Sequence, residues 1–207
     1  MRWQNAALGI MLVWSIFVVD AGANTFYDSL RSATLNPALN TSPTSADFSL
    51  DMTGSGALLS KPAGVGNGDI FLTTSFAATG DFTATVQVDG TNLGRAQLGL
   101  DCFAFESGYP AAQLAAQNPA QYSSGWADIF FLGTADVASN IWNGVSMPSV
   151  VVPDTDPSVL LRLRRTGDTL NSDYSTDDGL SFASVNSLSS PSLEGATTFA
   201  LFLIQPF

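Results

Sequence analysis

Aromatic and charged side chains gather where the sequence predicts strand ends, and their types suit the recognition of hydroxyl-rich ligands. Two tyrosines and two tryptophans lie at the ends of expected strands or in segment 110–124. Aromatic rings stack on the C–H faces of sugars, while Asp, Asn and Arg form hydrogen bonds with sugar hydroxyls. The candidate ligand-binding residues are Asp101, Tyr109, Tyr122, Trp126, Trp142, Arg162, Arg164 and Asp173. The two tryptophans could equally be core residues, and the sequence leaves both interpretations open.

Carboxyl pairs that could hydrolyse a glycosidic bond are present, but the sequence does not fix their geometry. His is absent, which excludes mechanisms that need an imidazole base. Asp101 and Glu106 lie on one expected strand at opposite parity, so their side chains point to opposite faces. Asp101 could instead meet Asp128 or Asp173 across strands, and a glycosidase needs carboxyl groups about 5 to 10 Å apart. We assign no catalytic residue and keep a hydrolase or lyase with such an Asp pair as an alternative.

Calcium is the one cofactor that the sequence leaves open. Asp154 and Asp156, together with Asp177 and Asp178, could supply oxygen ligands, because calcium binds six to eight oxygens from several loops. A solvated turn explains the same residues, and their spacing matches no calcium loop. The single cysteine, Cys102, lies in an apolar strand pattern and is expected to be a buried hydrophobic residue.

The composition indicates one globular, acidic domain. The chain has 207 residues, of which 45% are hydrophobic, and this is enough to bury a core without stabilising disulfides or metal ions. It carries 7 Lys and Arg against 18 Asp and Glu, a net charge of −11. Nucleic-acid binding requires the opposite sign, so a nucleic acid is excluded as a partner.

The N-terminal segment has the features of a secretory signal peptide. A basic start precedes the uncharged apolar run Ala6–Val19, and an A-x-A sequence follows it. A membrane span needs about 20 apolar residues, and no second long apolar run occurs, so no membrane segment is expected after cleavage. We predict a signal peptide at 1–23, a strand or linker segment at 24–47 and a β-sandwich domain at 48–207. Export would place the protein outside the cell or in a periplasm.

Short runs rich in Val, Ile, Thr and Phe, separated by Gly, Asn, Asp and Ser, predict an all-β protein. Apolar and polar residues alternate over Phe82–Val88, which is typical of an antiparallel strand with one buried face. The sequence therefore predicts a sandwich of two antiparallel sheets. The expected strands are Phe48–Met52, Ala57–Ser60, Asp69–Phe76, Asp81–Val88, Ala96–Glu106, Ala127–Leu132, Asn140–Trp142, Val159–Arg165, Thr169–Ser175, Ser181–Ser187 and Thr197–Gln205.

Two turns and one helix complete the expected elements. Gly167-Asp168 and the Asp-Gly at 178–179 predict tight hairpin turns, so that 159–187 forms a three-stranded meander. Ser175-x-Asp177-x-Gly179-x-x-Phe182 resembles the Asp-box turn of sialidases, with Phe in place of the usual Trp. The Asp and Ser side chains of that motif cap the turn, and we interpret it as structural. The Ala- and Gln-rich stretch Ala111–Gln117 predicts a short helix in a loop excursion. Both parities of Thr197–Gln205 are apolar, which predicts a strand covered on both faces.

Several short motifs occur in an order and spacing that resembles a known superfamily. They are Gly80-Asp81-Phe82, Gln97-Leu98-Gly99-Leu100, Leu161-Arg162-Leu163-Arg164-Arg165-Thr166-Gly167-Asp168-Thr169, Tyr174-Ser175-Thr176-Asp177-Asp178-Gly179 and Phe199-Ala200-Leu201-Phe202. Together they resemble the concanavalin A-like lectin/glucanase superfamily, most closely its laminin-G-like and DUF1349-like branch. The resemblance implies a jelly-roll sandwich whose members bind sugars, bind proteins or hydrolyse glucans.

The chain departs from this superfamily at two positions. Ala200 stands where the last strand normally has Gly, and neither of the two Glu residues fits the Glu-x-Asp-x-x-Glu motif of the hydrolases. We therefore predict a secreted, non-catalytic, lectin-like glycan-binding module, with adhesion or the extracellular matrix as its suggested setting. The alternatives are a glycoside hydrolase or lyase that uses an Asp pair and a structural or protein-binding, laminin-G-like module. Its oligomeric state is left open.

The predicted glycan site is one concave surface made by the polar faces of 81–88, 96–106 and 159–175. Parity places Asp101, Arg162, Arg164 and Asp173 outward on these strands. Because charges on a partly buried face need partners, we expect both arginines to meet Asp101 or Asp173.

Overall fold

The protein is an all-β structure in the residues that the computed structural model describes. These residues are 12–13, 17–21, 24–43, 49–60, 68–89, 97–103, 126–132, 136–141, 149–151, 158–190 and 195–205. Within these ranges the strands are antiparallel and lie in three sheets. In the same ranges no helix is long and apolar enough to cross a membrane.

A six-stranded sheet contains the predicted meander. Its order is β15 (Ala183–Ser189), β14 (Thr169–Ser175), β13 (Ser158–Thr166), β8 (Phe82–Asp89), β2 (Phe17–Ala21) and β3 (Asn24–Asp28). Every second residue of β8 is buried, as the alternation of its sequence predicts. The meander β13–β14–β15 is therefore confirmed.

A seven-stranded sheet forms the second large layer. Its order is β12 (Ser149–Val151), β11 (Asp136–Ile141), β10 (Trp126–Leu132), β9 (Gln97–Phe103), β16 (Thr198–Gln205), β7 (Gly68–Thr74) and β4 (Leu39–Pro43). A small third sheet has the order β1 (Leu12–Val13), β6 (Ala57–Ser60) and β5 (Ser49–Met52).

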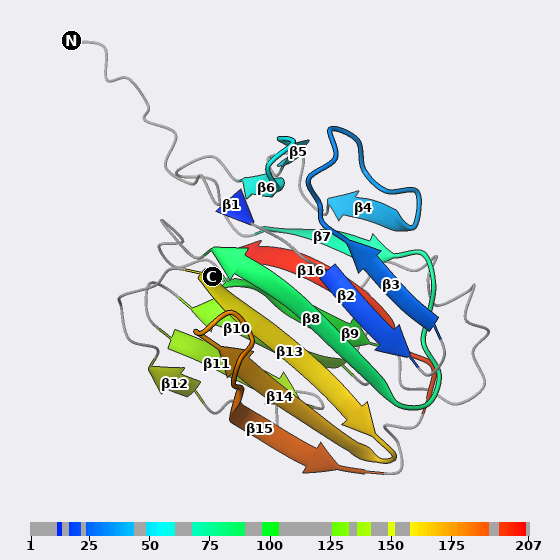
Figure 1. Cartoon of the computed structure of the whole chain (residues 1–207), viewed down its shortest axis with the longest axis vertical. Coiled ribbons are helices and arrows are strands. Elements are labelled where there is room, and N and C mark those ends of the chain that lie inside the picture. The colour runs from blue at the N-terminus through cyan, green and yellow to red at the C-terminus, as the bar shows by residue number, and fades with distance from the viewer. Residues whose placement is uncertain are drawn as a thin grey trace.

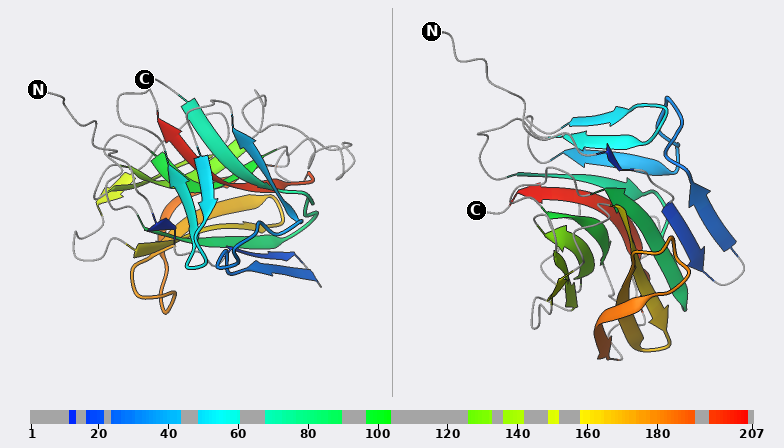
Figure 2. Two further views of the ribbon diagram at one scale, coloured as in Figure 1. Left: turned by 90° about the horizontal axis from the view of Figure 1, so that it is seen from above. Right: turned by 60° about the vertical axis from the view of Figure 1, so that its left-hand side comes forward.

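The two large sheets face each other as layers, and the main hydrophobic core lies between them (Figure 1, Figure 2). Val86 and Leu161 enter this core from the six-stranded sheet, and Leu100 and Phe199 enter it from the seven-stranded sheet. The predicted two-sheet sandwich is confirmed. Cys102 is buried in the same core, as expected.

β16 is buried on both faces, which confirms the prediction from its two apolar parities. Phe199, Leu201 and Leu203 point into the main core, whereas Ala200 and Phe202 belong to a second cluster on the outer face of the seven-stranded sheet. This second cluster also contains Phe71, Phe130 and Ala138. The outer face of this sheet is thus not an ordinary solvated surface.

The two glycine turns are also confirmed. Gly167 has φ 57° in the two-residue turn between β13 and β14, and Gly179 has φ 85° in the loop before β15. Glycine adopts these angles without the steric cost that a side chain would add. β15 begins at Ala183, two residues later than expected, because Ser181 takes part in the preceding turn.

Several strands lie partly or wholly outside the expected strand ranges, and segment 24–47, predicted as a strand or linker, supplies two of them. β3 and β4 from segment 24–47 are the outermost strands of the two large sheets, and β11 begins four residues before the expected strand. β2 lies inside the predicted signal peptide and pairs with β8 and β3 in the full chain. The expected helix Ala111–Gln117 lies outside the described residues.

Candidate functional site

The structure separates the predicted site residues onto two different outer faces. Asp101 lies on β9 of the seven-stranded sheet, whereas Arg162, Arg164 and Asp173 lie on β13 and β14 of the six-stranded sheet. The core lies between these sheets, so their outer faces point in opposite directions. The prediction of one surface holding all four residues is therefore wrong. Strand β9 pairs with β10 and β16 rather than with β8, which precedes it in the chain.

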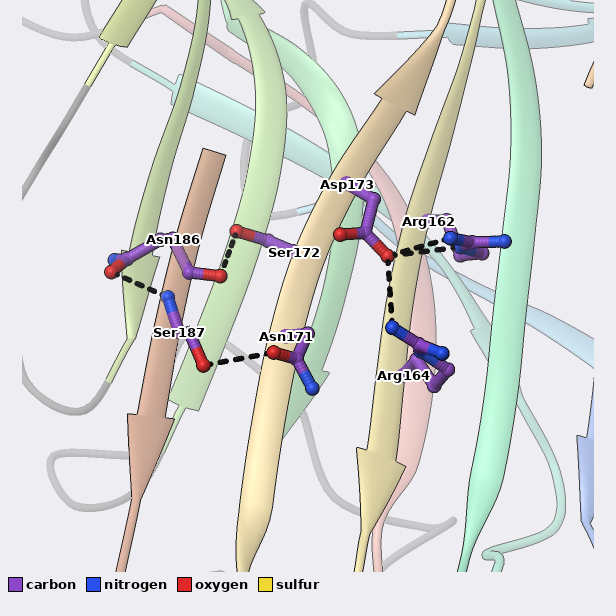
Figure 3. A network of polar contacts seen from close by, with 7 residues as sticks. All are labelled: Arg162, Arg164, Asn171, Ser172, Asp173, Asn186 and Ser187. Carbon is purple, nitrogen blue, oxygen red and sulfur yellow. Dashed lines mark hydrogen bonds and ion pairs between the residues drawn. The ribbon is translucent and has the colours of Figure 1, made fainter. Parts of the chain in front are cut away.

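On the six-stranded sheet, both arginines meet Asp173, as expected. Arg162 donates to Asp173 Oδ2 from Nε at 3.1 Å and from Nη2 at 2.8 Å. Arg164 Nη2 lies 3.9 Å from the same oxygen (Figure 3). The Asp173 side chain is 7% exposed and that of Arg164 is 46% exposed. Asp173 therefore serves mainly Arg162, and Arg164 extends into solvent.

A loop between β14 and β15 fixes the position of the Arg162 guanidinium. The Cζ atom of Arg162 lies 3.5 Å from the centre of the Phe182 ring, a cation–π contact. The loop itself is capped by its own side chains: Asp177 accepts hydrogen bonds from Ser175 Oγ at 2.7 Å and from Ser181 Oγ at 2.6 Å. These hydrogen bonds, led by that from Ser181, lower the pKa of Asp177 to about 2. The structural interpretation of the Asp-box-like motif is confirmed.

On the seven-stranded sheet, two aspartates face each other across adjacent strands. Asp101 and Asp128 are paired in register between β9 and β10. Residues that are paired in this way have side chains on the same face. Burial raises the pKa of the Asp101 carboxyl well above its usual 3.8, and the nearby charge of Asp128 raises it further. The structure thus selects one of the two pairings that the sequence left open.

Three buried side-chain oxygens, one in Asp101 itself and two in neighbouring threonines, lack hydrogen-bond partners within the described part of the chain. They are Asp101 Oδ1, Thr73 Oγ1 and Thr198 Oγ1. Ala200 lies between Asp101 and Thr73 in the register of the sheet, and Thr198 lies two residues before Ala200 on the same face. Buried polar atoms are nearly always hydrogen-bonded in native proteins, so three such oxygens on neighbouring strands indicate a place for a polar ligand or water.

A row of aromatic side chains lies immediately beside this polar row. Phe71, Phe130 and Phe202 lie two residues along their strands from Thr73, Asp128 and Ala200. The ring centres of Phe130 and Phe202 are 6.2 Å apart, as are those of Phe71 and Phe202. Gly99 separates Phe130 from Phe202 in the register. We name the region formed by the polar residues Asp101, Asp128, Thr73 and Thr198 and by the rings of Phe71, Phe130 and Phe202 the Asp101 face.

The fold has known relatives among solved structures. It is similar to a lectin from Bauhinia forficata in complex with GalNAc, with TM-score 0.55 and 11% identity over 86% of this chain and 89% of that chain. It is also similar to a protein of unknown function with a galectin-like fold from Bacillus subtilis, with TM-score 0.50 and 11% identity over 90% and 94%. A Lotus tetragonolobus seed lectin gives TM-score 0.50 and 8% identity over 84% and 87%.

The chain has the concanavalin A-like lectin fold. Identities this low show the fold alone. No family model matches the sequence, and no curated protein matches it.

Within this lectin fold, the structure does not test the aromatic residues that the sequence singled out. Tyr109, Tyr122 and Trp142 lie outside the described residues, and Trp126 is the first residue of β10, two positions before Asp128. Sequence analysis missed the Asp101-face residues Thr73, Thr198, Phe71, Phe130 and Phe202. The sign of them in the sequence was that β7 and β16 carry apolar residues at both parities. This feature becomes meaningful only once the register of these strands relative to β9 is known.

The calcium prediction is likewise open in this lectin fold. Asp154 and Asp156 lie outside the described residues, and both carboxylate oxygens of Asp177 accept hydrogen bonds from within its own loop. Among the residues that the structure describes, no group of three His, Cys, Asp or Glu could hold a metal ion.

Proposed function

We propose that this protein is a carbohydrate-binding module and that the Asp101 face binds the sugar. The observation that carries this proposal is a row of three buried oxygens, Asp101 Oδ1, Thr73 Oγ1 and Thr198 Oγ1, which have no hydrogen-bond partner among the described residues and lie beside a row of phenyl rings. The lectin fold supports the same conclusion, since one structure that shares it, the Bauhinia forficata lectin, holds GalNAc.

The polar atoms of the Asp101 face match the hydroxyl groups of a sugar ring. Carboxylate oxygens accept hydrogen bonds from sugar hydroxyls, and threonine hydroxyls both donate and accept. The rings of Phe71, Phe130 and Phe202 are only 4%, 1% and 1% exposed, so they pack beside the polar row and are not an open stacking surface. Asp101 as a residue is half-buried, although its Oδ1 is buried, and Asp128 is 8% exposed, so Asp101 is the residue of the polar row that lies nearest to solvent.

The first prediction concerns Asp101→Asn. Its amide keeps the shape but loses the charge, so binding of a glycan that the wild type retains should weaken by about tenfold or more. Stability should change in the opposite direction. A raised carboxyl pKa contributes stability below pH 3.8 that is lost as the pH rises through the folded-state value. At pH 7 the variant should therefore be more stable than the wild type by about 1–2 kcal/mol.

Urea unfolding at several pH values and a glycan-binding titration measure these two effects. The stability difference should shrink as the pH falls and should vanish below pH 3.8, where Asp101 is protonated in both the folded and the unfolded state of the wild type. Asp51→Asn is the matched control, because Asp51 is exposed on β5. An Asp101→Asn variant that binds glycans like the wild type would rule out the Asp101 face as the sugar site.

One observation favours a second candidate function, glycoside hydrolysis. Asp101 has a raised pKa and lies directly opposite Asp128, so the pair places a proton donor opposite a second carboxyl group. Asp101 would protonate the leaving glycosidic oxygen as the C–O bond breaks. Asp128 would take a proton from the water that attacks the anomeric carbon. Release of reducing ends from a bound oligosaccharide, abolished in Asp128→Asn, would support hydrolysis; stable binding without product release would leave the module non-catalytic.

Export from the cell is proposed from the sequence features of residues 1–23. Cleavage after Ala23 would remove β2 and leave β8 without its pairing partner on that side, since β2 lies between β8 and β3. N-terminal sequencing of the exported protein should then begin at Asn24. A chain that still begins at Met1, held in a membrane fraction, would contradict this prediction.

A further inference from the structure

The outer face of the six-stranded sheet, opposite the Asp101 face, carries a second arrangement of polar side chains (Figure 3). At its centre, two guanidinium groups share one carboxylate, which leaves one net positive charge on Arg162, Arg164 and Asp173. This charge is notable in a chain whose net charge is −11.

Arg164 is the cation that this arrangement leaves available. Asp173 Oδ2 already accepts two hydrogen bonds from Arg162, at 2.8 and 3.1 Å, and lies 3.9 Å from Arg164 Nη2. A separation of 3.9 Å is too long for a hydrogen bond, so among the residues that the structure describes the donors of Arg164 are not engaged. With its side chain 46% exposed, Arg164 can turn these donors toward a ligand.

The neighbours of Arg164 are also donors. Asn171 is paired in register with Arg164, and its Oδ1 accepts a hydrogen bond from Ser187 Oγ at 2.8 Å. Because the oxygen of this amide is engaged, its NH₂ group is the end left to meet a ligand. On the other side, Thr83 of β8 is paired with Arg164 and lies on the outward-facing parity of its strand. The row Asn171–Arg164–Thr83 therefore presents an amide, a guanidinium and a hydroxyl.

The neighbouring Arg162 is held in place and does not compete for this row. Asp173 engages its guanidinium from the side, and Phe182 covers it at 3.5 Å. The loop that carries Phe182 is fixed by the hydrogen bonds of Ser175 and Asp177. The site is thus built on paired strands with a rigid edge, which reduces the entropy lost on binding.

We propose that Arg164, Asn171 and Thr83 form a second binding site, specific for the oxyanion of an acidic saccharide, a carboxylate or a sulfate ester. A guanidinium matches such a group with two parallel hydrogen bonds, and the amide and hydroxyl add a donor on each side. The inference that the ligand is a saccharide rests on the proposed function. The inference that it is an anion rests on the residues of the six-stranded sheet alone. The net charge of −11 repels anions in general, so an anion that binds does so through local contacts.

The test is a calorimetric titration of the full chain with four probes. Oligogalacturonate and its methyl ester form one pair, and a sulfated maltooligosaccharide and its neutral parent form the other. We expect one or both acidic probes to bind and both neutral partners to bind at least about tenfold more weakly at this site. The acidic probe that binds more tightly identifies the oxyanion. Binding should weaken as the salt concentration rises.

Two substitutions place the effect on Arg164. Arg164→Gln should weaken binding of the acidic probe by about tenfold or more. Arg164→Lys should keep only part of the wild-type affinity, because an ammonium group keeps the positive charge but cannot form two parallel hydrogen bonds with one oxyanion. Urea midpoints close to that of the wild type confirm that both variants are folded. Equal binding of acidic and neutral probes, or unchanged binding by Arg164→Gln, would overturn the proposal.

Asp101→Asn separates this proposal from the proposed function. It should leave binding of the acidic probe unchanged, because Asp101 lies on the other sheet. Loss of acidic-probe binding in Asp101→Asn would place the acidic ligand on the Asp101 face and refute the second site. Unchanged neutral-glycan binding in Asp101→Asn would refute the proposed function and leave the anion site standing.

Discussion

Replacing Arg165 by methionine should destabilise the fold by about 3 kcal/mol or more. Arg165 is 1% exposed, and its guanidinium joins three segments that are distant in the chain. Nε donates to Gly80 O at 2.7 Å, and Nη1 donates to Gly195 O at 2.6 Å and to Thr197 Oγ1 at 3.0 Å. The ring of Phe82 lies 4.8 Å from its Cζ atom. Methionine supplies apolar packing but leaves two buried acceptors, Gly195 O and Thr197 Oγ1, without that donor.

Arg164→Met is the matched control for this prediction. It makes the same chemical change one residue earlier on β13, on the opposite face of the strand, where the side chain is 46% exposed. Surface changes of this kind usually alter stability by less than about 0.5 kcal/mol. Urea unfolding gives both values, provided that the m-values agree. If the two variants had equal unfolding midpoints, Arg165 would not anchor this end of the sandwich.

Replacing Gly99 by alanine should cost about 3 kcal/mol or more and should also disturb the Asp101 face. A methyl group on Gly99 would lie 2.5 Å from Phe130 Cβ and 2.7 Å from Phe130 Cα, and closer still to the carbonyl oxygen of Ile129. These atoms belong to β10, so relief requires β9 and β10 to move apart. That movement would separate Asp101 from Asp128.

Gly167→Ala provides the comparison for Gly99→Ala. Gly167 has φ 57°, and a methyl group there would meet no described atom within 4 Å, so the expected cost is only the strain of a left-handed residue, about 1 kcal/mol. Gly99 is not among the glycines with positive φ, and its cost comes from contact alone. Thermal unfolding should therefore rank Gly99→Ala well below Gly167→Ala. The opposite ranking would show that β9 and β10 adjust to the methyl group easily.

Local patterns in the sequence were sufficient for the meander and its turns. Alternation along β8, together with Gly167 and Gly179 between strands, predicted β13, β14 and β15 in their correct order. A hairpin pairs residues that are close in the chain, so turn residues and parity specify both the partner and the register. The contacts of both arginines with Asp173 followed from the same local pairing.

The inward position of Arg165 was readable but overlooked. Leu161, Leu163 and Arg165 share one parity on β13, so a core that contains the two leucines also receives the guanidinium. The acceptors that make this burial acceptable, Gly80 O and Gly195 O, lie 85 and 30 residues away in the chain and have no local sequence signal.

By itself, the sequence determined the all-β class, the local hairpins and the face to which each residue of a strand belongs, because these depend on periodicity and on turn chemistry between neighbours. Only the tertiary structure decided which sheet each strand joins. Strand β9 follows β8 in the chain yet pairs with β10 and β16, and this pairing brings Asp101 to Asp128 and Thr73 while it separates Asp101 from Arg164. Parity fixes a side chain relative to its own strand, but the assignment of strands to sheets is set by long-range packing of apolar faces, which single-strand patterns do not encode.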